Sequence, residues 1–284
     1  MNQVRVTPIL ELRDASFRYP DGSVGLDQCS ITIGRGSRTV LLGANGAGKT
    51  TLLLHCNGIL RPESGRICFD GFPLDYGRDA LRKLRSSVGL VFQNPDNQLF
   101  SASVLEDVSF GPINLGLDSQ AVRERVKDAL SAVGMDDYAD KPVHNLSYGQ
   151  KKRVCIAGVL AMRPQVMILD EPTAGLDVEM RHKLMDILQR LHGEGMTVIM
   201  ATHDVDLAYS WADDVCILDH GRSVMECPAG ELPDKALVLE RYGLGVPHVA
   251  PIYRLLASRG MFPPEERTPR SCAELARLLK EYSD

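Results

Sequence analysis

Apolar and polar residues alternate in several short runs of the first hundred residues. A period of two is typical of strands that bury one face, and a short, mostly apolar run is typical of a strand buried on both faces. The runs that predict strands are residues 9–19, 26–33, 38–42, 66–69 and 88–93. Residues 38–42 are mostly apolar and lead directly into a glycine-rich segment, after which helical spacing begins.

Downstream of residue 163, apolar runs alternate with segments of helical spacing. Strands are predicted at 166–169, 197–201 and 215–218, and helices at 179–191 and 205–211. Strands that alternate with helices favour a doubly wound sheet whose strands are largely parallel.

Residues 94–163 have mostly helical spacing and predict a helical insert between strands. Helices are expected at 104–110, 121–133 and 147–162. Because glycine and proline end helices, we expect Gly111-Pro112 to end the first of these and Gly134 the second. The charged run Lys151-Lys152-Arg153 is expected to form a solvated face of the third helix.

Beyond residue 228, prolines divide the chain into short helical pieces. The last piece is the clearest, because Ser271 and Glu274 predict a capping box. An apolar stripe at helical spacing follows: Leu275, Leu278, Leu279 and Tyr282. We expect this stripe to pack against the body of the chain, with a partner protein as the alternative.

Composition narrows the class of protein. The 284 residues are 44% hydrophobic and 24% charged, an ordinary globular balance. The net charge of −5 disfavours a general nucleic-acid binder, which usually has a basic surface. No apolar run approaches the ~20 residues that cross a bilayer, and no signal peptide is evident. We therefore expect a soluble chain that is not exported.

The seven cysteines form no C-x-x-C pair, and several lie in apolar runs. This usage predicts reduced, buried thiols in a cytosolic protein. The histidines are scattered and form no H-E-x-x-H motif, so the sequence predicts no site for a transition metal.

The strongest chemical motif is residues 43–50, GANGAGKT, which fits G-x-x-x-x-G-K-[ST]. The strand predicted before it and the helix predicted after it are the context that such a loop requires. Its glycines let backbone N–H groups surround phosphate oxygens, and the helix adds its positive end. Lys49 can reach the β- and γ-phosphates, and the Thr50 hydroxyl can hold Mg²⁺.

A second motif is the apolar strand 166–169, which ends in Asp170 and Glu171. In open α/β sheets, ligands bind at the carboxyl ends of strands. Asp170 is therefore placed to hold Mg²⁺ through water, and Glu171 to orient or polarise an attacking water. The strand 197–201 delivers His203 to the same edge, where imidazole can bond a phosphate oxygen and a catalytic carboxylate.

A third motif, Leu146-Ser147-Tyr148-Gly149-Gln150, lies between the first two. With them, it makes the chain resemble the ATP-binding subunits of ABC transporters, whose signature is usually L-S-G-G-Q. Tyr148 replaces the first glycine of that signature, so we expect this position to tolerate glycine. Three further features match the same family: Gln93 after a strand, residues 174–177 after Glu171, and Tyr19. The resemblance covers roughly residues 8 to 227.

The resemblance implies an α/β fold, namely a P-loop NTPase (RecA-like) core with a mixed sheet, an inserted helical subdomain and a small C-terminal helical extension. Residues 1–93 and 164–227 would form the ATP-binding core, which includes N-terminal antiparallel strands. Residues 94–163 would form the helical subdomain with the signature motif. Residues 228–284 would be the extension, expected to stabilise a dimer or to act as a regulatory lid.

The resemblance also implies ATP and Mg²⁺ as cofactors and a role for individual residues. The residues that would serve hydrolysis are Glu171, His203, Lys49 and Gln93. Those that would hold Mg²⁺, partly through water, are Thr50, Gln93 and Asp170. Those that would contact nucleotide are Tyr19, Gly43, Asn45, Gly46, Ala47, Gly48, Lys49, Thr50, Thr51, Ser147, Gly149, Gln150 and Asp177.

Three of these roles involve particular geometry. Tyr19 would stack on adenine, and an ordinary strand aromatic is the alternative. The resemblance implies that Ser147 and Gly149 would contact the γ-phosphate of ATP held by a second copy. Ser147 starts a helix, so its hydroxyl and the following N–H groups form an anion site. Asp177 would lie at the interface between the two copies.

Residues 91–100 and 146–153 resemble the energy-coupling-factor branch of the family, and Tyr148 is similar to a variant in its cobalt-uptake ATP-binding subunits. The branch implies an ATP-hydrolysing motor subunit of an importer, with cobalt ions as the first expected cargo. An importer of nickel or of a vitamin is the alternative. A non-transport ABC ATPase that acts on nucleic acid is less favoured, because the chain is acidic and has no sustained heptad run.

The partners implied are a second ATP-binding subunit, a transmembrane coupling subunit and a substrate-binding membrane subunit, and no nucleic acid. One complete set of motifs favours a homodimer over a heterodimer. The implied location is peripheral, on the cytoplasmic face of the cell membrane. The residues expected to relay motion to the membrane partner are Asp96, Asn97, Gln98 and Phe100.

Overall fold

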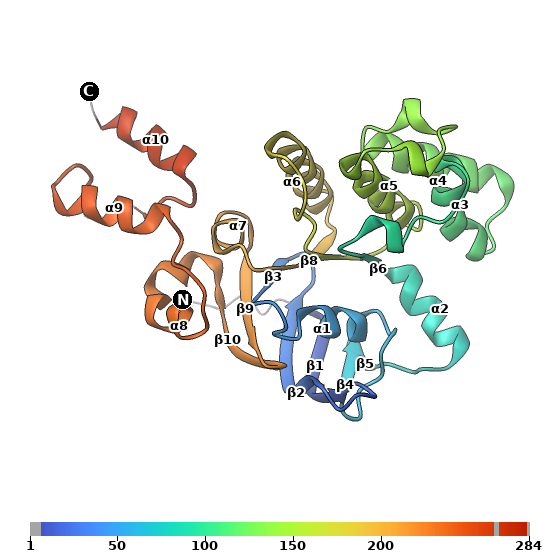
Figure 1. The fold of residues 1–284 in the computed structure, drawn as a ribbon, viewed down its shortest axis with the longest axis horizontal. Helices are drawn as coiled ribbons and strands as arrows, with labels where there is room; N and C mark the ends of the chain where they lie inside the picture. Colours follow the sequence, from blue (N-terminus) through green and yellow to red (C-terminus); the bar gives the residue numbers. More distant parts are fainter. Residues whose placement is uncertain (1–6, 264–266, 283–284) are drawn as a thin grey trace.

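The computed structural model describes residues 7–263 and 267–282, so residues 1–6 of the expected core and residues 264–266 and 283–284 of the expected extension lie outside the described residues. Two sheets form its centre (Figure 1). The smaller sheet is antiparallel, with the strand order β2-β1-β4-β5. Its strands are β1 (Pro8–Arg18), β2 (Val24–Gly34), β4 (Ser64–Phe69) and β5 (Phe72–Pro73).

The larger sheet has the strand order β10-β9-β3-β8-β7-β6. Its strands are β3 (Arg38–Leu42), β6 (Val88–Val91), β7 (Val166–Asp170), β8 (Thr197–Thr202), β9 (Asp214–Asp219) and β10 (Arg222–Pro228). Neighbouring strands from β9 to β6 are parallel, while β10 pairs with β9 in the antiparallel sense. The sheet is therefore mixed, which confirms the predicted α/β class with antiparallel N-terminal strands.

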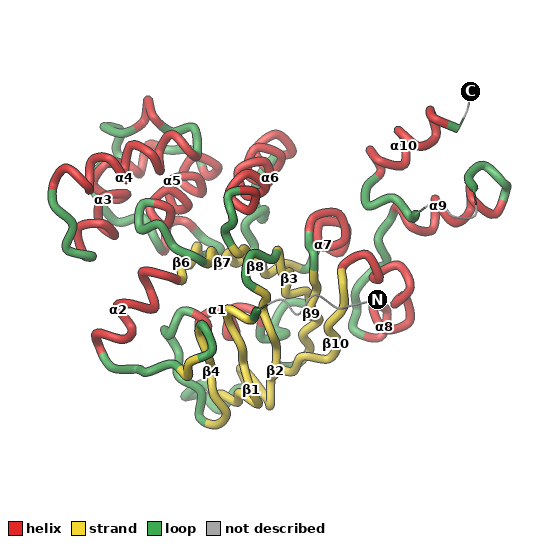
Figure 2. The backbone as a smooth tube through the Cα atoms, turned by 180° about the vertical axis from the view of Figure 1, so that it is seen from behind, coloured by secondary structure: helices red, strands yellow, loops and turns green. Residues whose placement is uncertain are grey.

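Helices surround the larger sheet. Those that follow its strands are α1 (Lys49–Cys56), α6 (Val178–Gly193) and α7 (Val205–Trp211), and α2 (Arg78–Ser87) precedes β6. Between β6 and β7 lie α3 (Val104–Asn114), α4 (Ser119–Ala132) and α5 (Tyr148–Leu160). Figures 1 and 2 both show these three helices together beyond the β6 edge of the sheet. After β10 come α8 (Ala236–Arg241), α9 (Val249–Ser258) and α10 (Cys272–Glu281).

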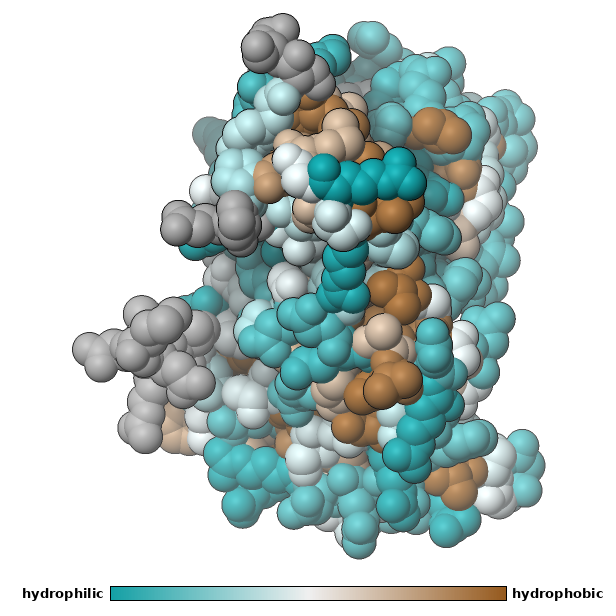
Figure 3. All heavy atoms as spheres, turned by 90° about the vertical axis from the view of Figure 1, so that its left-hand side faces the viewer, coloured by the Kyte–Doolittle hydropathy of each residue, from teal (hydrophilic) through white to brown (hydrophobic). Residues whose placement is uncertain are grey.

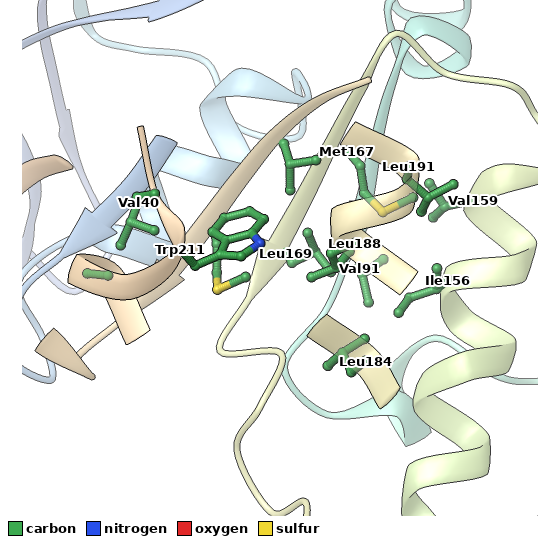
Figure 4. Close-up of a cluster of buried hydrophobic side chains, with 14 of the residues drawn as sticks. Val40, Val91, Ile156, Val159, Met167, Leu169, Leu184, Leu188, Leu191 and Trp211 are labelled. Atoms are coloured by element: carbon green, nitrogen blue, oxygen red, sulfur yellow. The ribbon is translucent and has the colours of Figure 1, made fainter. Parts of the chain in front are cut away.

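The central strands are apolar throughout because each of their faces covers a different hydrophobic core. In β8, Val198 and Met200 belong to one cluster and Ile199 and Ala201 to the other. Figure 4 shows the first cluster, in which side chains of α5, α6 and α7 cover one face of the sheet. The second cluster lies between the other face, α1 and the smaller sheet. The continuous apolar runs thus reflect burial on both sides.

The prediction that Gly111-Pro112 would end a helix is wrong, because α3 continues to Asn114. Proline removes one N–H donor, but the helical bonds resume after it, with the N–H of Leu115 donating to the carbonyl of Gly111. Gly111 instead permits close packing of α3 on α5 and on the residues just after it, since a Cβ at this position would lie 3.5 Å from the Gly158 carbonyl oxygen and 2.7 Å from Met162 Cγ.

The last helix is confirmed, but its cap differs from the prediction. Ser271 accepts a bond from the N–H of Glu274, while the Glu274 carboxylate accepts the N–H of Arg270 and not that of Ser271. The predicted capping box is therefore only half formed. Leu275 and Leu278 are buried in the first hydrophobic cluster, which confirms that the apolar stripe packs against the chain itself.

Six of the cysteines are buried and free, as the sequence predicts, whereas Cys272 in α10 is exposed. None of the helices within residues 7–263 and 267–282 has the length and apolar character that a membrane span requires.

The solvated face expected for Lys151-Lys152-Arg153 is wrong at Lys152, whose exposed fraction is only 1%. This residue lies on the inner side of α5, and its Nζ donates to the carbonyl of Phe92 at 3.4 Å. Burial lowers the pKa of Lys152 to about 8, although the nearby carboxylates of Asp170 and Glu171 oppose this effect.

We predict that the stability contributed at this position depends on pH. Between about 8 and the ~10.4 of an ordinary lysine, the unfolded chain keeps a proton that folded Lys152 has released. The free energy of unfolding should therefore rise with pH in wild type relative to Lys152→Met, by up to about 1.4 kcal/mol per pH unit. Urea titrations of both proteins across this window measure the difference in the free energy of unfolding, and a constant or falling difference would contradict a lowered pKa of Lys152.

Candidate functional site

The loop between β3 and α1 can adopt its conformation because of two glycines. Gly48 has φ +101°, and a Cβ there would lie 2.7 Å from the carbonyl oxygen of Gly25. A Cβ on Gly43 would lie 2.5 Å from the carbonyl oxygen of Leu218. Since Gly48 supplies no side chain to cap α1, the first N–H groups of that helix retain their capacity to bind an anion. Of the other predicted loop residues, Asn45 and Gly46 are exposed and Ala47 is buried.

Lys49 places a buried positive charge beneath this loop. Its Nζ donates to the carbonyls of Gly43 at 2.7 Å and Ala44 at 3.0 Å, and it lies 3.7 Å from Glu171 Oε1. Burial lowers the pKa of Lys49, and the charges of Glu171 and Asp170 oppose that shift. The ammonium group is therefore placed between the phosphate loop and two carboxylates.

Thr50 and Asp170 bring two oxygen ligands together. The Thr50 hydroxyl donates to Asp170 Oδ2 at 2.7 Å, which joins the start of α1 to the end of β7. Burial raises the pKa of Asp170, while the bond from Thr50 lowers it. Hydroxyl and carboxylate oxygens are the ligands that Mg²⁺ prefers, so this pair fits the cation implied by the sequence.

Glu171 follows β7 in a strained backbone conformation. Its φ is +41°, which costs a residue other than glycine roughly 1–3 kcal/mol and persists only where the surroundings hold it. Its N–H donates to the carbonyl of Ala201, and its side chain accepts a bond from the Thr202 hydroxyl at 3.4 Å. Its Oε1 lies 3.0 Å from His203 Nδ1. The carboxylate is buried, whereas the imidazole is 61% exposed and open to a ligand.

Tyr19 lies against Thr51, in the first turn of α1. The Tyr19 hydroxyl and Thr51 Oγ1 are 2.9 Å apart, and the Tyr19 ring meets the Phe17 ring edge-to-face at 5.1 Å between centroids. The two predicted nucleotide contacts are thus neighbours, and the Tyr19 ring is partly exposed.

Ser147, Gly149, Gln150 and Asp177 form a second group at the N-termini of α5 and α6. Ser147 and Gln150 make a reciprocal capping box, and Asp177 caps α6 by accepting the N–H of Met180 at 2.7 Å. Gly149 lies against the Met180 side chain, because a Cβ on Gly149 would lie 3.1 Å from Met180 Cγ. Within the described parts of the chain, Ser147 has no hydrogen bond to the phosphate loop.

Gln93 follows β6 and contacts the first turn of α5. Its side chain is exposed, and among the described residues it has no hydrogen bond to Thr50 or Asp170. Its carbonyl accepts a bond from the Tyr148 hydroxyl at 3.2 Å. The structure therefore joins Gln93 to the signature helix through its backbone.

Two residues of this region were missed by sequence reasoning. Thr202 precedes His203 at the end of β8, so its position in the motif could have indicated it. Lys152 gave no signal, because a lysine within a charged run predicts a solvated position.

The phosphate loop, Asp170, Glu171 and His203 form the first group. Their arrangement can perform hydrolysis of a nucleoside triphosphate. A buried ammonium group and free helix N–H groups can bind phosphate oxygens, and paired oxygens can hold a divalent cation. A carboxylate hydrogen-bonded to imidazole can orient water for attack. The second group presents a helix N-terminus that can bind a further anion.

Known proteins with similar sequences show the family of this chain. The sequence profile of the ABC transporter family matches residues 26–174. The energy-coupling factor transporter ATP-binding protein EcfA of Methanocaldococcus jannaschii is 48% identical over 257 residues, which cover 90% of this chain and 92% of that protein.

Two solved structures have the same fold. CbiO1 of Clostridium perfringens, part of the ABC transporter complex CbiONQ, is 45% identical with a TM-score of 0.75, and the match covers 87% of this chain and 99% of CbiO1. A dimeric ATP-binding cassette in a post-hydrolysis state, bound to ADP and Pi, is 27% identical with a TM-score of 0.72, and the match covers 78% of this chain and 99% of the cassette. The chain therefore belongs to the ABC transporter family, as an ATP-hydrolysing subunit of the energy-coupling-factor type.

Proposed function

We propose that this ATPase subunit drives an importer whose cargo is cobalt ions. The observation that carries the motor function is the convergence of Lys49, Asp170 and Glu171 at one edge of the sheet. The cargo is supported by the similarity of the Tyr148 variant to cobalt-uptake subunits and by the similarity of the chain to CbiO1 of the CbiONQ complex. Nickel and vitamin importers are the alternatives, because the cargo site should lie in another polypeptide.

In this proposal the residues of the first group divide the work of hydrolysis. Lys49 and the first N–H groups of α1 hold phosphate oxygens, and Thr50 and Asp170, with Gln93, hold Mg²⁺ partly through water. The cation, when bound, supplies neutralisation of phosphate charge. Glu171 orients the attacking water, and His203, whose Nδ1 lies 3.0 Å from Glu171 Oε1, would stabilise that carboxylate and bond a phosphate oxygen.

The second group acts on ATP that is held by a second copy of the chain. Support comes from the bonds of Ser147, which stay within its own helix start, and from the dimeric form of the similar cassette. Ser147 and Gly149 would contact the partner's γ-phosphate, and Asp177 would lie at the interface. Contacts that only the closed dimer makes would let ATP favour closure. Tyr19 would stack on adenine.

Residues 228–284 would stabilise this dimer or act as a regulatory lid. Figure 3 faces this part of the molecule and shows apolar residues among hydrophilic ones. The exposed fraction is 83% at Leu237, 55% at Leu255 and 47% at Ile252. Exposed apolar side chains on one part of a surface are typical of contact with another protein.

A groove between α2, β6, α3 and α5 supports docking of the transmembrane coupling subunit. It has a volume of about 990 Å³, and its lining includes Gln98 and Phe100, two of the residues expected to relay motion. Phe100 and Phe110 are exposed and meet edge-to-face at 4.8 Å. Asp96 pairs with Lys151 at 2.7 Å, so the segment that borders the groove is joined to the signature helix. Docking here would place the chain on the cytoplasmic face of the membrane.

Replacing Lys49 by Ala should weaken ATP binding by at least tenfold and abolish turnover, because it removes the buried cation that faces the phosphates. Titration with a fluorescent nucleotide and measurement of phosphate release test this. Lys183→Ala is the matched control, since Lys183 forms an exposed pair with Glu179. Unchanged ATP affinity and turnover in Lys49→Ala would refute the site.

Replacing Glu171 by Gln should leave ATP binding intact and lower turnover by about 10²- to 10⁴-fold, because the amide cannot accept a proton from water. The variant should then accumulate as an ATP-bound dimer, which gel filtration with and without ATP detects. Glu179→Gln, on the exposed face of α6, is the control. A monomer at saturating ATP would count against the two-copy arrangement.

The cargo is tested in cells that express this chain with its membrane partners. Accumulation of radioactive cobalt should exceed that of cells carrying Glu171→Gln by at least tenfold, because transport requires hydrolysis. Parallel uptake of nickel decides between the two metals. Nickel uptake without cobalt uptake, or uptake of neither metal, would overturn the cobalt assignment.

A further inference from the structure

Tyr148 is the residue at which this chain departs from the usual signature, and its side chain has contacts outside its own helix. The hydroxyl donates to the carbonyl of Gln93 at 3.2 Å. The ring lies against Gly175, since a Cβ on that glycine would lie 3.2 Å from Tyr148 Cε1. Burial raises the pKa of Tyr148, so the phenol keeps its proton and remains a donor at neutral pH.

The same side of α5 makes further contacts with the segment that follows β6. Lys152 Nζ donates to the carbonyl of Phe92 at 3.4 Å and lies 5.9 Å from the centroid of the Tyr148 ring. Gln98 Nε2 donates to the carbonyl of Cys155 at 3.3 Å, and Gln98 Oε1 accepts the N–H of Phe92. Several hydrogen bonds therefore hold residues 92–98 against α5.

Three segments meet at Tyr148, and each contains a residue of the proposed mechanism. Gln93 follows β6, Ser147 and Gly149 flank Tyr148 in the first turn of α5, and Gly175 lies two residues before Asp177. A displacement of the first turn of α5 would therefore act directly on the backbone of Gln93 and on the loop that carries Asp177.

We propose that Tyr148 is a positioning residue, whose hydroxyl and ring hold Gln93 and Gly175 to the first turn of α5 so that the three segments move together. This inference rests on the proposed function of Gln93 and Asp177. It also bears on the expectation that Tyr148 tolerates glycine: glycine would remove both contacts, so hydrolysis should suffer even though the usual family signature has glycine here.

The decisive variant is Tyr148→Phe, which removes the hydroxyl and keeps the ring. We expect kcat for ATP hydrolysis to fall about threefold to tenfold, the effect of losing one hydrogen bond, while KM for ATP changes less than twofold. Tyr148→Gly should lower kcat further. The matched control is Tyr138→Phe, which removes a hydroxyl from the same group of helices, where the Tyr138 ring lies beneath Lys141 Nζ at 4.2 Å.

Hydrogen–deuterium exchange of the full chain separates positioning from a general loss of stability. The backbone N–H groups of residues 94 and 96–98 should exchange faster in Tyr148→Phe than in wild type or in the control. Two of them, those of Asn97 and Gln98, donate to the carbonyls of Asn94 and Pro95. Amides of β7 and β8 should be unchanged.

A Tyr148→Phe protein with wild-type kcat and wild-type exchange in this segment would overturn the proposal, whether or not Tyr148→Gly folds. Lower kcat with uniformly faster exchange across the chain would also overturn it, because that result indicates a structural role. A wild-type chain without ATPase activity would refute the proposed function instead, and the exchange comparison would still decide whether Tyr148 holds the segment.

Discussion

Parallel pairing of β3, β8 and β7 brings the functional groups together. Leu42 is level with Thr202, and Ala201 is level with Asp170, so three neighbouring strands end at the same edge. At this edge lie the phosphate loop after β3, His203 after β8, and Asp170 and Glu171 at the end of β7. Because these strands are buried on both faces between two apolar cores, their relative position is fixed by packing.

The charged side chains at this edge are buried, and an isolated charge in a buried position would destabilise the fold. Lys49, Asp170 and Glu171 are nearly buried, and burial shifts the pKa of Lys49 down and that of Asp170 up. Their mutual attraction and the bond from Thr50 offset part of this cost. A polar site of fixed geometry inside an apolar scaffold needs little reorganisation when charge develops on a phosphate.

The second group shows how a helical segment can be connected to that site without touching it. Ser147 and Gly149 begin α5, and the side of the same helix that carries Tyr148 and Lys152 contacts the backbone just after β6. Since β6 pairs with β7, the segment is attached at one end to the strand that bears Asp170. Polar contacts therefore join α5 to the segment next to the hydrolytic edge, in addition to the apolar packing of α5 on the sheet.

Local pattern was sufficient for much of this protein. The loop of residues 43–50, the acidic end of β7 and His203 after β8 could be predicted because each depends on residues adjacent in the chain and on the rule that ligands meet strand ends. Apolar period and length located the strands of the larger sheet, except β10. They did not reveal that Gly111 serves helix packing, since that role depends on Met162, 51 residues away.

Tertiary structure decided what depends on distant partners. The burial of Lys152, the half-formed cap at Ser271 and the contacts of Tyr148 with Gln93 and Gly175 follow from which surfaces meet, and no local pattern encodes that. The sequence by itself determined the chemistry of the site and the order of its elements, because both are properties of short segments. Only the fold decided which helix faces are buried, because burial is set by segments that approach one another from far apart in the chain.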